Sequence, residues 1–115
     1  MQYALLIYQT AEDFAARTDP VKMEAFWGSF MPYLAAIRGA GIVVAGAGLE
    51  PPEMTTTVRK GPNGRLVQDG PFADAKEQLG GFFVIEVPNL DTALDWASRC
   101  PTGTVEVRPC TPPKE

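Results

Sequence analysis

Short apolar runs rich in strand-favouring residues mark the strands that the chain is expected to form. Residues 2–8, 42–45, 82–87 and 104–108 are such runs. The first is apolar on both faces, because successive side chains of a strand point to opposite sides. One face carries Tyr3, Leu5 and Ile7, and the other carries Ala4, Leu6 and Tyr8. Two polar runs, 55–59 and 65–68, flank a Gly-Pro-Asn-Gly sequence and predict a β-hairpin with a tip of about four residues.

A repeat of three and four residues predicts a long amphipathic helix that starts at Asp19-Pro20 and stops at Gly39 and Gly41. Pro32 lies inside this helix and removes a backbone donor, so we expect a kink or two shorter helices near residues 28–32. The apolar stripe of the helix consists of Met23, Phe26, Trp27, Phe30, Leu34 and Ile37.

Two further helical segments are expected. Residues 73–79 allow one or two helical turns, which Gly80-Gly81 would end. Asn89 is placed to cap a later helix that ends before Pro101. The order β-α-β-β-α-β with an inserted hairpin predicts one α+β domain over residues 1–115. Right-handed crossovers place both long helices on one face of a mostly antiparallel sheet, which is the ferredoxin-like arrangement.

The opposite face of this sheet would be apolar and bare, with Leu6, Tyr8, Phe82 and Val84 on it. Soluble monomers rarely expose an apolar surface of that kind. The simplest way to bury this face is to pack it against the same face of a second copy of the chain. We therefore expect a homodimer in which two sheets pack face to face, the dimeric α+β barrel.

Charge and composition exclude several classes of function. The net charge is −4, so a phosphate-backbone binder is not expected and nucleic acid is not an expected partner. No apolar run approaches a membrane span, and Met1-Gln2-Tyr3 lacks the pattern of a signal peptide, so we expect a cytoplasmic protein without a membrane partner. The chain has no His, which excludes Ser-His-Asp, Cys-His and His-zinc chemistry.

No cofactor or metal is predicted. The loop Gly46-Ala47-Gly48 lacks the spacing of a phosphate-binding loop. Asp69, Asp74 and Glu77 are the only clustered carboxylates, a weak basis for a metal site. Two cysteines, Cys100 and Cys110, are too few for a metal cage. We expect Cys100 to be a buried free thiol and Cys110 to lie in the C-terminal tail, and a disulfide between them is less favoured.

The sequence from Asp69 to Phe82, Asp-Gly-Pro-Phe-Ala-Asp-Ala-Lys-Glu-Gln-Leu-Gly-Gly-Phe, resembles the YCII-related family, in the branch marked by Asp-Gly-Pro-Phe. The resemblance extends to the opening strand, to residues 45–52 and to residues 96–101. It implies a ferredoxin-like fold, a dimer and a pocket near Asp69. Distant relatives resemble lyases that remove halide from small acids. Relatives also often carry a His that partners the motif's Asp, whereas the matching position here is Trp27.

Asp69 is the candidate catalytic residue, as a general base whose pKa burial near Phe72 and Phe82 would raise, or else a residue that fixes the turn. Lys76 is a candidate to hold an anionic substrate and Glu77 to relay protons, unless both lie on a solvated helical face. Tyr8 and Trp27 would line a substrate pocket or form part of the core.

These residues predict a dimeric protein that binds a small anionic or aromatic metabolite between sheet and helix. They leave open whether it is a lyase or isomerase-type enzyme that uses Asp69 for acid-base chemistry. The alternative is a non-catalytic accessory or regulatory module that acts through protein contacts, for example beside an alternative sigma factor. The ligand, the reaction and the partner stay open.

Overall fold

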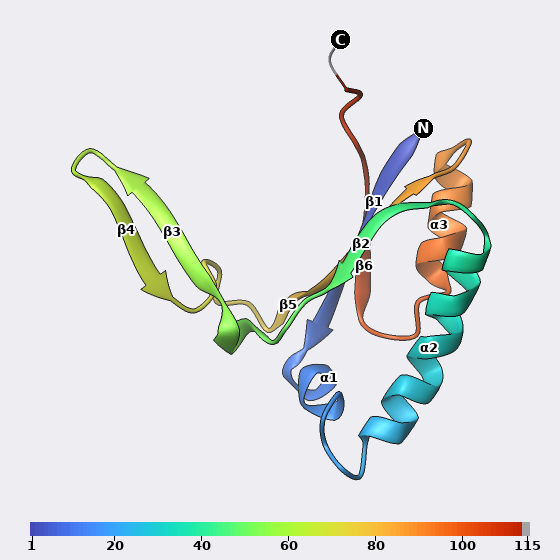
Figure 1. Cartoon of the computed structure of the whole chain (residues 1–115), viewed down its shortest axis with the longest axis horizontal. Coiled ribbons are helices and arrows are strands. Elements are labelled where there is room, and N and C mark those ends of the chain that lie inside the picture. The colour runs from blue at the N-terminus through green and yellow to red at the C-terminus, as the bar shows by residue number, and fades with distance from the viewer. Residues whose placement is uncertain (114–115) are drawn as a thin grey trace.

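The computed structural model describes residues 1–113, which form an antiparallel α+β fold (Figure 1). Its order of elements is compatible with the ferredoxin-like arrangement. In chain order the elements are β1 (Gln2–Thr10), α1 (Ala11–Ala16), α2 (Met23–Gly39), β2 (Val43–Gly48), a 3₁₀ turn (Pro52–Met54), β3 (Thr56–Gly61), β4 (Gly64–Asp69), β5 (Glu77–Glu86), α3 (Leu90–Ser98) and β6 (Thr104–Pro109).

Four strands form the main sheet in the order β2-β5-β1-β6, and each neighbouring pair is antiparallel. The central strands β1 and β5 pair from Gln2 opposite Glu86 to Thr10 opposite Glu77, with one irregularity. Ile7 lies opposite Gly81 and Tyr8 opposite Leu79, so Gly80 is an extra residue in β5. Such a bulge disrupts the ladder locally, and the Gly80 carbonyl oxygen accepts from the Leu49 amide just beyond β2 at 2.9 Å.

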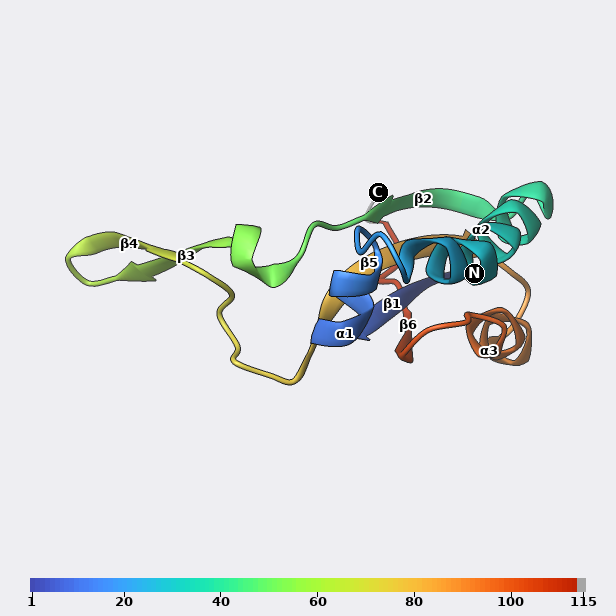
Figure 2. The same cartoon turned by 90° about the horizontal axis from the view of Figure 1, so that it is seen from below.

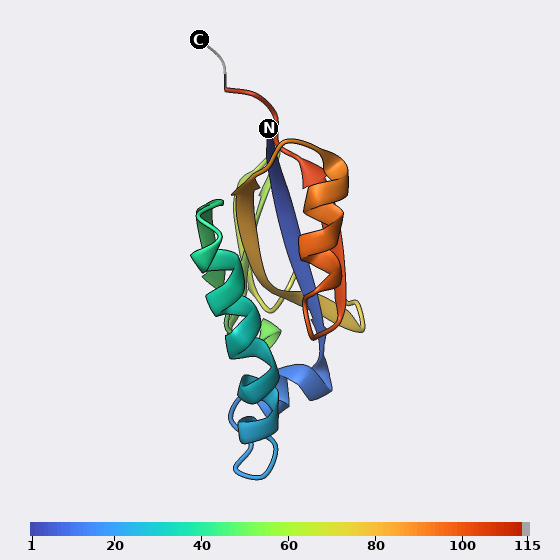
Figure 3. The same ribbon diagram turned by 90° about the vertical axis from the view of Figure 1, so that its right-hand side faces the viewer.

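Helices α2 and α3 lie side by side on one face of this sheet (Figure 3). That face buries the alternating residues predicted for β1, together with the apolar side of α2. Leu5, Ile37 and Ile85 are fully enclosed. The rest of the core consists of Tyr3, Ile7, Phe30, Tyr33, Phe83, Val87, Ala93 and Ala97. We call this sheet with its two helices the body.

The other face of the sheet has no helix on it among the described elements (Figures 2 and 3). Its side chains are partly exposed, as the alternation along β1 predicts. They include Ala4, Leu6, Tyr8, Phe82 and Val84.

The β3–β4 hairpin, residues 56–69, projects from the body as a separate two-stranded arm (Figure 1). The radius of gyration is 16.2 Å, compared with about 13 Å for a compact domain of this length. Gly61 pairs with Gly64, so the predicted hairpin is confirmed with a shorter tip of Pro62 and Asn63. Its larger apolar side chains, Val58, Leu66 and Val67, are at least half exposed.

Two helix predictions differ from the structure. Residues 73–79 form no helix, because β5 already begins at Glu77 and pairs with Thr10. Lys76 and Glu77 therefore lie before and at the start of a strand, and Gly80-Gly81 lies inside it. The Gln78 side-chain amide donates to the carbonyl oxygens of Ala73 and Ala75, which holds the preceding segment in a turn.

The continuous helix begins at Met23 and not at Asp19-Pro20. The Asp19 carboxylate still accepts from the amides of Val21 and Lys22, as expected of a capping residue, and a turn separates it from the helix. The helix continues through Pro32 as one element, so a division near residues 28–32 is wrong. Burial of Phe30, Tyr33 and Ile37 on the sheet offsets the hydrogen bond lost at the proline. The predicted stop at Gly41 is confirmed by its φ of 72°.

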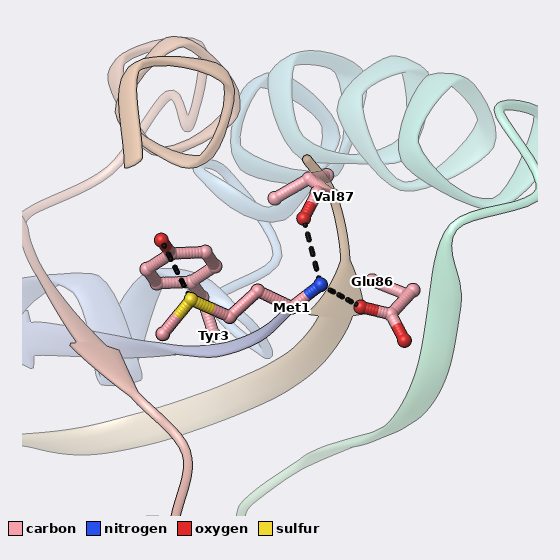
Figure 4. A network of polar contacts seen from close by, with 4 residues as sticks. All are labelled: Met1, Tyr3, Glu86 and Val87. Carbon is pink, nitrogen blue, oxygen red and sulfur yellow. Dashed lines mark hydrogen bonds and ion pairs between the residues drawn. The ribbon is translucent and has the colours of Figure 1, made fainter. Parts of the chain in front are cut away.

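Polar contacts near Met1 hold the ends of the central strands β1 and β5 together (Figure 4). The Met1 amino nitrogen lies 2.5 Å from a Glu86 carboxylate oxygen and donates to the Val87 carbonyl oxygen at 3.1 Å. Cys100 and Cys110 are free, so they form no disulfide. No helix within residues 1–113 is long and apolar enough to span a membrane.

Candidate functional site

A cleft of about 180 Å³ opens between α2 and the β2–β5–β1 part of the sheet. Its walls are mainly aromatic and aliphatic, and two arginines and a glutamine supply the polar side chains. We call it the Arg17 cleft. The lining consists of Ile7, Gln9, Arg17, Phe26, Trp27, Phe30, Leu34, Arg38, Ala47, Gly48, Gly80, Gly81, Phe82 and Phe83.

Helix α1 places Arg17 at the polar end of this cleft. Thr10 caps the helix by accepting from the Asp13 amide, and the Asp13 carboxylate accepts from the Thr10 amide in return. Arg17 is the C-terminal cap residue. The indole Nε1 of Trp27 donates to the Arg17 carbonyl oxygen at 2.9 Å, which ties the end of α1 to α2.

The Arg17 guanidinium is fixed by three hydrogen bonds to the ends of three strands. Nη1 donates to the Leu49 carbonyl oxygen at 2.5 Å. Nη2 donates to Gln9 Oε1 at 2.6 Å and to the carbonyl oxygen of the bulged Gly80 at 3.0 Å. A guanidinium held in this way keeps one orientation, so any group that binds it meets a prepared site.

Gln9 is the buried centre of this network, with 2% of its surface exposed. Its Nε2 donates to Thr102 Oγ1 at 3.2 Å while its Oε1 accepts from Arg17. A side chain on Gly80 would collide with Gln9, since an added Cβ would come within 2.4 Å of Gln9 Oε1. A side chain at Gly80 would therefore force Gln9 away from its bonds to Arg17 and Thr102.

The charge of Arg17 has no close counter-ion within residues 1–113. Asp13 and Glu50 act on it from beyond ion-pair distance, and burial lowers the pKa of the guanidinium. Its Nε is enclosed and has no hydrogen-bond partner among the described residues. Leaving such a donor unsatisfied typically costs about 1–3 kcal/mol, so the fold holds Arg17 in this position at a cost in stability.

Two of the predicted site residues lie together in the Arg17 cleft. Trp27 lines it from α2, and Phe82 borders it from β5 although its side chain lies on the bare face of the sheet. The ring of Trp27 also packs edge-on against Phe26, with centroids 5.0 Å apart. Trp27 thus packs against its neighbours and also lines the cleft, so the two roles considered for it from the sequence do not exclude each other.

Asp69 lies elsewhere, at the exposed end of β4. It lines neither the Arg17 cleft nor the two hollows beside Pro51 and Pro71, and its side chain makes no hydrogen bond or ion pair with residues 1–113. The turn after it is held by other groups. The Gly70 amide donates to the Thr55 carbonyl oxygen at 2.7 Å, and Thr57 Oγ1 donates to the Gly70 carbonyl oxygen at 2.7 Å.

The remaining predicted residues are dispersed around the base of the arm and the bare sheet face. Phe72 is 68% exposed and packs under the Arg59 guanidinium, 4.6 Å from its ring centroid. Lys76 lines a separate hollow at the base of the arm. Glu77 accepts a hydrogen bond from Thr104 at 3.1 Å. Tyr8 is on the bare face, where a hydrogen bond to Glu106 raises the pKa of its hydroxyl group.

Sequence reasoning missed Gln9 and Arg17, the residues that make the polar end of the cleft. The available signal was Thr10 followed three residues later by Asp13, which is typical of a helix start and places Arg17 just after a short helix. The bulge at Gly80 has no such signal, because two consecutive glycines also end helices. Residues 1–113 contain no cluster of three His, Cys, Asp or Glu side chains placed to hold a metal.

Comparison with known proteins identifies a family model that covers almost the whole chain. The YCII-related domain matches residues 1–113. An uncharacterized protein of Rhizobium meliloti (strain 1021) is 44% identical over 68 residues, which is 55% of this chain and 55% of that protein. The match therefore spans about half the length of this relative.

Proposed function

The chain belongs to the YCII-related family, and from this premise we propose that it is a homodimeric protein that binds a small molecule in the Arg17 cleft. The observation that carries the proposal is a guanidinium fixed by three hydrogen bonds at one end of an otherwise apolar cleft. Binding sites typically combine apolar walls with a few well-placed polar groups. Gln9 and Arg17 fit that description.

Two features of the chain support the homodimer. The bare face of the sheet presents apolar side chains from β1 and β5, which a second sheet would cover as in a dimeric α+β barrel. A two-stranded hairpin is marginally stable alone, so the arm benefits from a second surface. The arm carries three basic residues and one acidic residue, whereas the chain as a whole has a net charge of −4. An arm of this charge complements the acidic remainder of a partner copy.

Catalysis by Asp69 remains a further proposal. Asp69 is exposed at the end of β4, and a general base must lie within hydrogen-bond reach of the proton that it removes. A lyase or isomerase-type mechanism therefore requires another surface, such as a partner copy, to enclose Asp69 with the substrate. Loss of turnover in Asp69→Asn, for any substrate that is found, is the expected result for this role.

The binding proposal is tested by filling the cleft. Gly48 lines the cleft, and an added Cβ there meets nothing within 4 Å, so Gly48→Leu should occupy the cleft without unfolding the chain. Gly28→Leu is the matched control, because Gly28 is also free of Cβ contacts and lies outside the lining. A metabolite library is screened by the rise in melting temperature.

Compounds that stabilise the unmodified chain and Gly28→Leu, but not Gly48→Leu, are the expected result. A library with no stabilising compound, or compounds that stabilise both variants equally, contradicts the cleft as the site. Light scattering at micromolar concentration measures the homodimer separately, and a monomer there contradicts that part of the proposal.

A second candidate function is supported by the arm. Its exposed Val58, Leu66 and Val67 give it an apolar surface suited to contacts with another protein, as expected of an accessory module. Val58→Lys with Val67→Lys separates the two uses of this surface. If the double variant becomes monomeric, the arm is part of the homodimer. If it stays dimeric, the arm remains available to a different protein.

A further inference from the structure

The Arg17 cleft carries positive charge in a chain that is acidic overall. Among residues 1–113, its charged lining consists of Arg17 and Arg38, and no Asp or Glu lines it. The whole chain nevertheless has fourteen acidic residues against ten basic ones. A concave, low-dielectric site lined by charge of one sign concentrates ligands of the opposite sign. The charge of the lining therefore favours an anionic ligand.

Arg17 is the stronger of the two positions for an anion. Arg38 is exposed on α2, where a charge is well hydrated and binds weakly. Arg17 is partly buried, has no ion pair with the described residues, and is fixed by Gln9, Leu49 and Gly80. A cation removed from water without a counter-ion is unfavourable, and an entering carboxylate would relieve that cost.

The donors that remain on Arg17 limit the size of the anionic group. A guanidinium has five N–H donors, and three of them are spent on protein oxygens. Of the two that remain, the one on Nε is enclosed and points away from the free N–H of Nη1. Nη1 therefore offers one donor, which suits one oxygen of a single carboxylate group. A phosphate group has more acceptor oxygens and a higher charge, and the lining offers no lysine and no helix N-terminus for them.

The walls of the cleft suit a flat apolar body attached to this carboxylate. The rings of Phe26 and Phe30 lie nearly parallel, with an interplanar angle of 11° and centroids 5.9 Å apart. Trp27 meets both rings edge-on. The volume of about 180 Å³ is below the ~300–1,000 Å³ of sites for drug-sized ligands, so the body must be small.

We propose that the Arg17 cleft recognises a small carboxylic acid with a flat apolar body, whose carboxylate binds Arg17 and whose body packs against Phe26, Trp27 and Phe30. This inference rests on the proposed small-molecule function and assigns it a chemical class of ligand. Arg17 is then the residue that selects an acid over its neutral analogue.

Trp27 provides a direct signal for the test. The chain has two tryptophans, and Trp96→Phe leaves Trp27, in the wall of the cleft, as the single fluorophore. In this background, phenylacetate, its neutral analogue phenylacetamide and inorganic phosphate are titrated at pH 7. Phenylacetate should bind at least about tenfold more tightly than the amide, because its hydrogen bond to Arg17 is charge-assisted. Phosphate should change the fluorescence little at the same concentrations.

Three variants assign the preference to Arg17. In Arg17→Gln the ratio of the two affinities should fall close to one, and in Arg17→Lys it should lie between those values because charge remains without the planar fork. Arg99→Gln is the control, since Arg99 lies outside the cleft and its loss should leave the ratio unchanged. Circular dichroism checks each fold. If Arg17→Gln does not fold, the ratio of phenylacetate to phenylacetamide affinity is compared between the chain with Arg17 and Arg17→Lys, and equal ratios contradict the role of Arg17.

The outcomes separate this inference from the function on which it rests. Equal binding of acid and amide overturns the choice of a carboxylate and leaves a small-molecule site. Phosphate binding as tight as that of phenylacetate overturns the ligand class in the same way. If neither organic probe binds the chain and the cleft-filling screen also finds no ligand, both the inference and the proposed function are wrong.

Discussion

The body and the arm are both made of antiparallel strands, but only the body has a core. In the body, β1 and β5 bury every second residue beneath α2 and α3, and Leu5, Ile37 and Ile85 are fully enclosed. In the arm, both faces of the hairpin are open and Leu66 is 59% exposed. Strand pairing thus determines how the strands are arranged, but burial of one face of the strands is what stabilises the fold.

The same contrast separates the two candidate chemistries. Arg17 belongs to the body, where burial lowers its pKa and three oxygens fix its position. Asp69 belongs to the arm and is exposed, without a side-chain partner among the described residues. Asp69, which belongs to the most recognisable motif of the sequence, is therefore exposed in the arm. The Arg17 cleft is built from residues that belong to no such motif.

The largest expected effect is the loss of a core side chain from the body. Ile37→Ala should lower the free energy of unfolding by about 3–5 kcal/mol, because Ile37 is fully buried and a cavity remains after truncation. Val67→Ala in the arm should cost less than about 1 kcal/mol, since half of Val67 is already exposed. Urea denaturation at low protein concentration measures both.

The arm variant also reports on the homodimer. If Val67→Ala costs as much as Ile37→Ala, and the cost grows with protein concentration, the arm is buried against a second copy. If the cost stays small at all concentrations, the arm is free in solution and its apolar side chains do not stabilise the fold.

Much of the body could be predicted from the sequence, because its strands and helices differ in period. The alternation in β1 and the Asn89 cap of α3 are local patterns, and both are confirmed. The helix predicted over residues 73–79 does not form, because the segment from Glu77 pairs with Thr10 as a strand and this pairing outweighs its helical propensity. The polar end of the cleft brings Gln9, Arg17 and Gly80 together, and a single sequence contains no signal for such a long-range contact.

Substitution of the bulged glycine gives the next largest effect. In Gly80→Ala the new methyl group meets Gln9 Oε1 at 2.4 Å, so Gln9 must move and its bonds to Arg17 and Thr102 are strained. The expected cost is about 1–3 kcal/mol, with weaker ligand binding in the Arg17 cleft. Gly48→Ala is the matched control for stability alone, because nothing lies within 4 Å of its added Cβ although Gly48 lines the cleft. Equal melting temperatures for the two variants would mean that Gln9 adapts freely and that the Arg17 network is loose.

The pH dependence of the body provides a smaller effect. Burial raises the pKa of Tyr33 above its ordinary value of 10.0, and its hydroxyl group donates to the Trp96 carbonyl oxygen at 3.0 Å. The unfolded chain therefore loses this proton first. The stabilisation is complete below pH 10 and declines as the pH rises above it.

Tyr33→Phe should remove this decline and cost about 1 kcal/mol at neutral pH. Burial also raises the pKa of Cys100 from 9.0, so both chains are compared in a Cys100→Ala background. Denaturation between pH 8 and pH 11 measures the slopes. Parallel slopes with and without the Tyr33 hydroxyl group would show that another group causes the alkaline loss.

The smallest effect is expected at Asp69, in the arm. Asp69→Asn should change the free energy of unfolding by less than about 0.5 kcal/mol, because the carboxylate is exposed and unbonded. Thr57→Val is the paired variant, since Thr57 Oγ1 donates to the Gly70 carbonyl oxygen at 2.7 Å, and its loss should cost about 1 kcal/mol. If Asp69→Asn proves the more damaging of the two, the carboxylate fixes the turn after all, and its chemistry is structural. If the order is as expected, the Asp69 carboxylate is free to act on a substrate or a second copy of the chain.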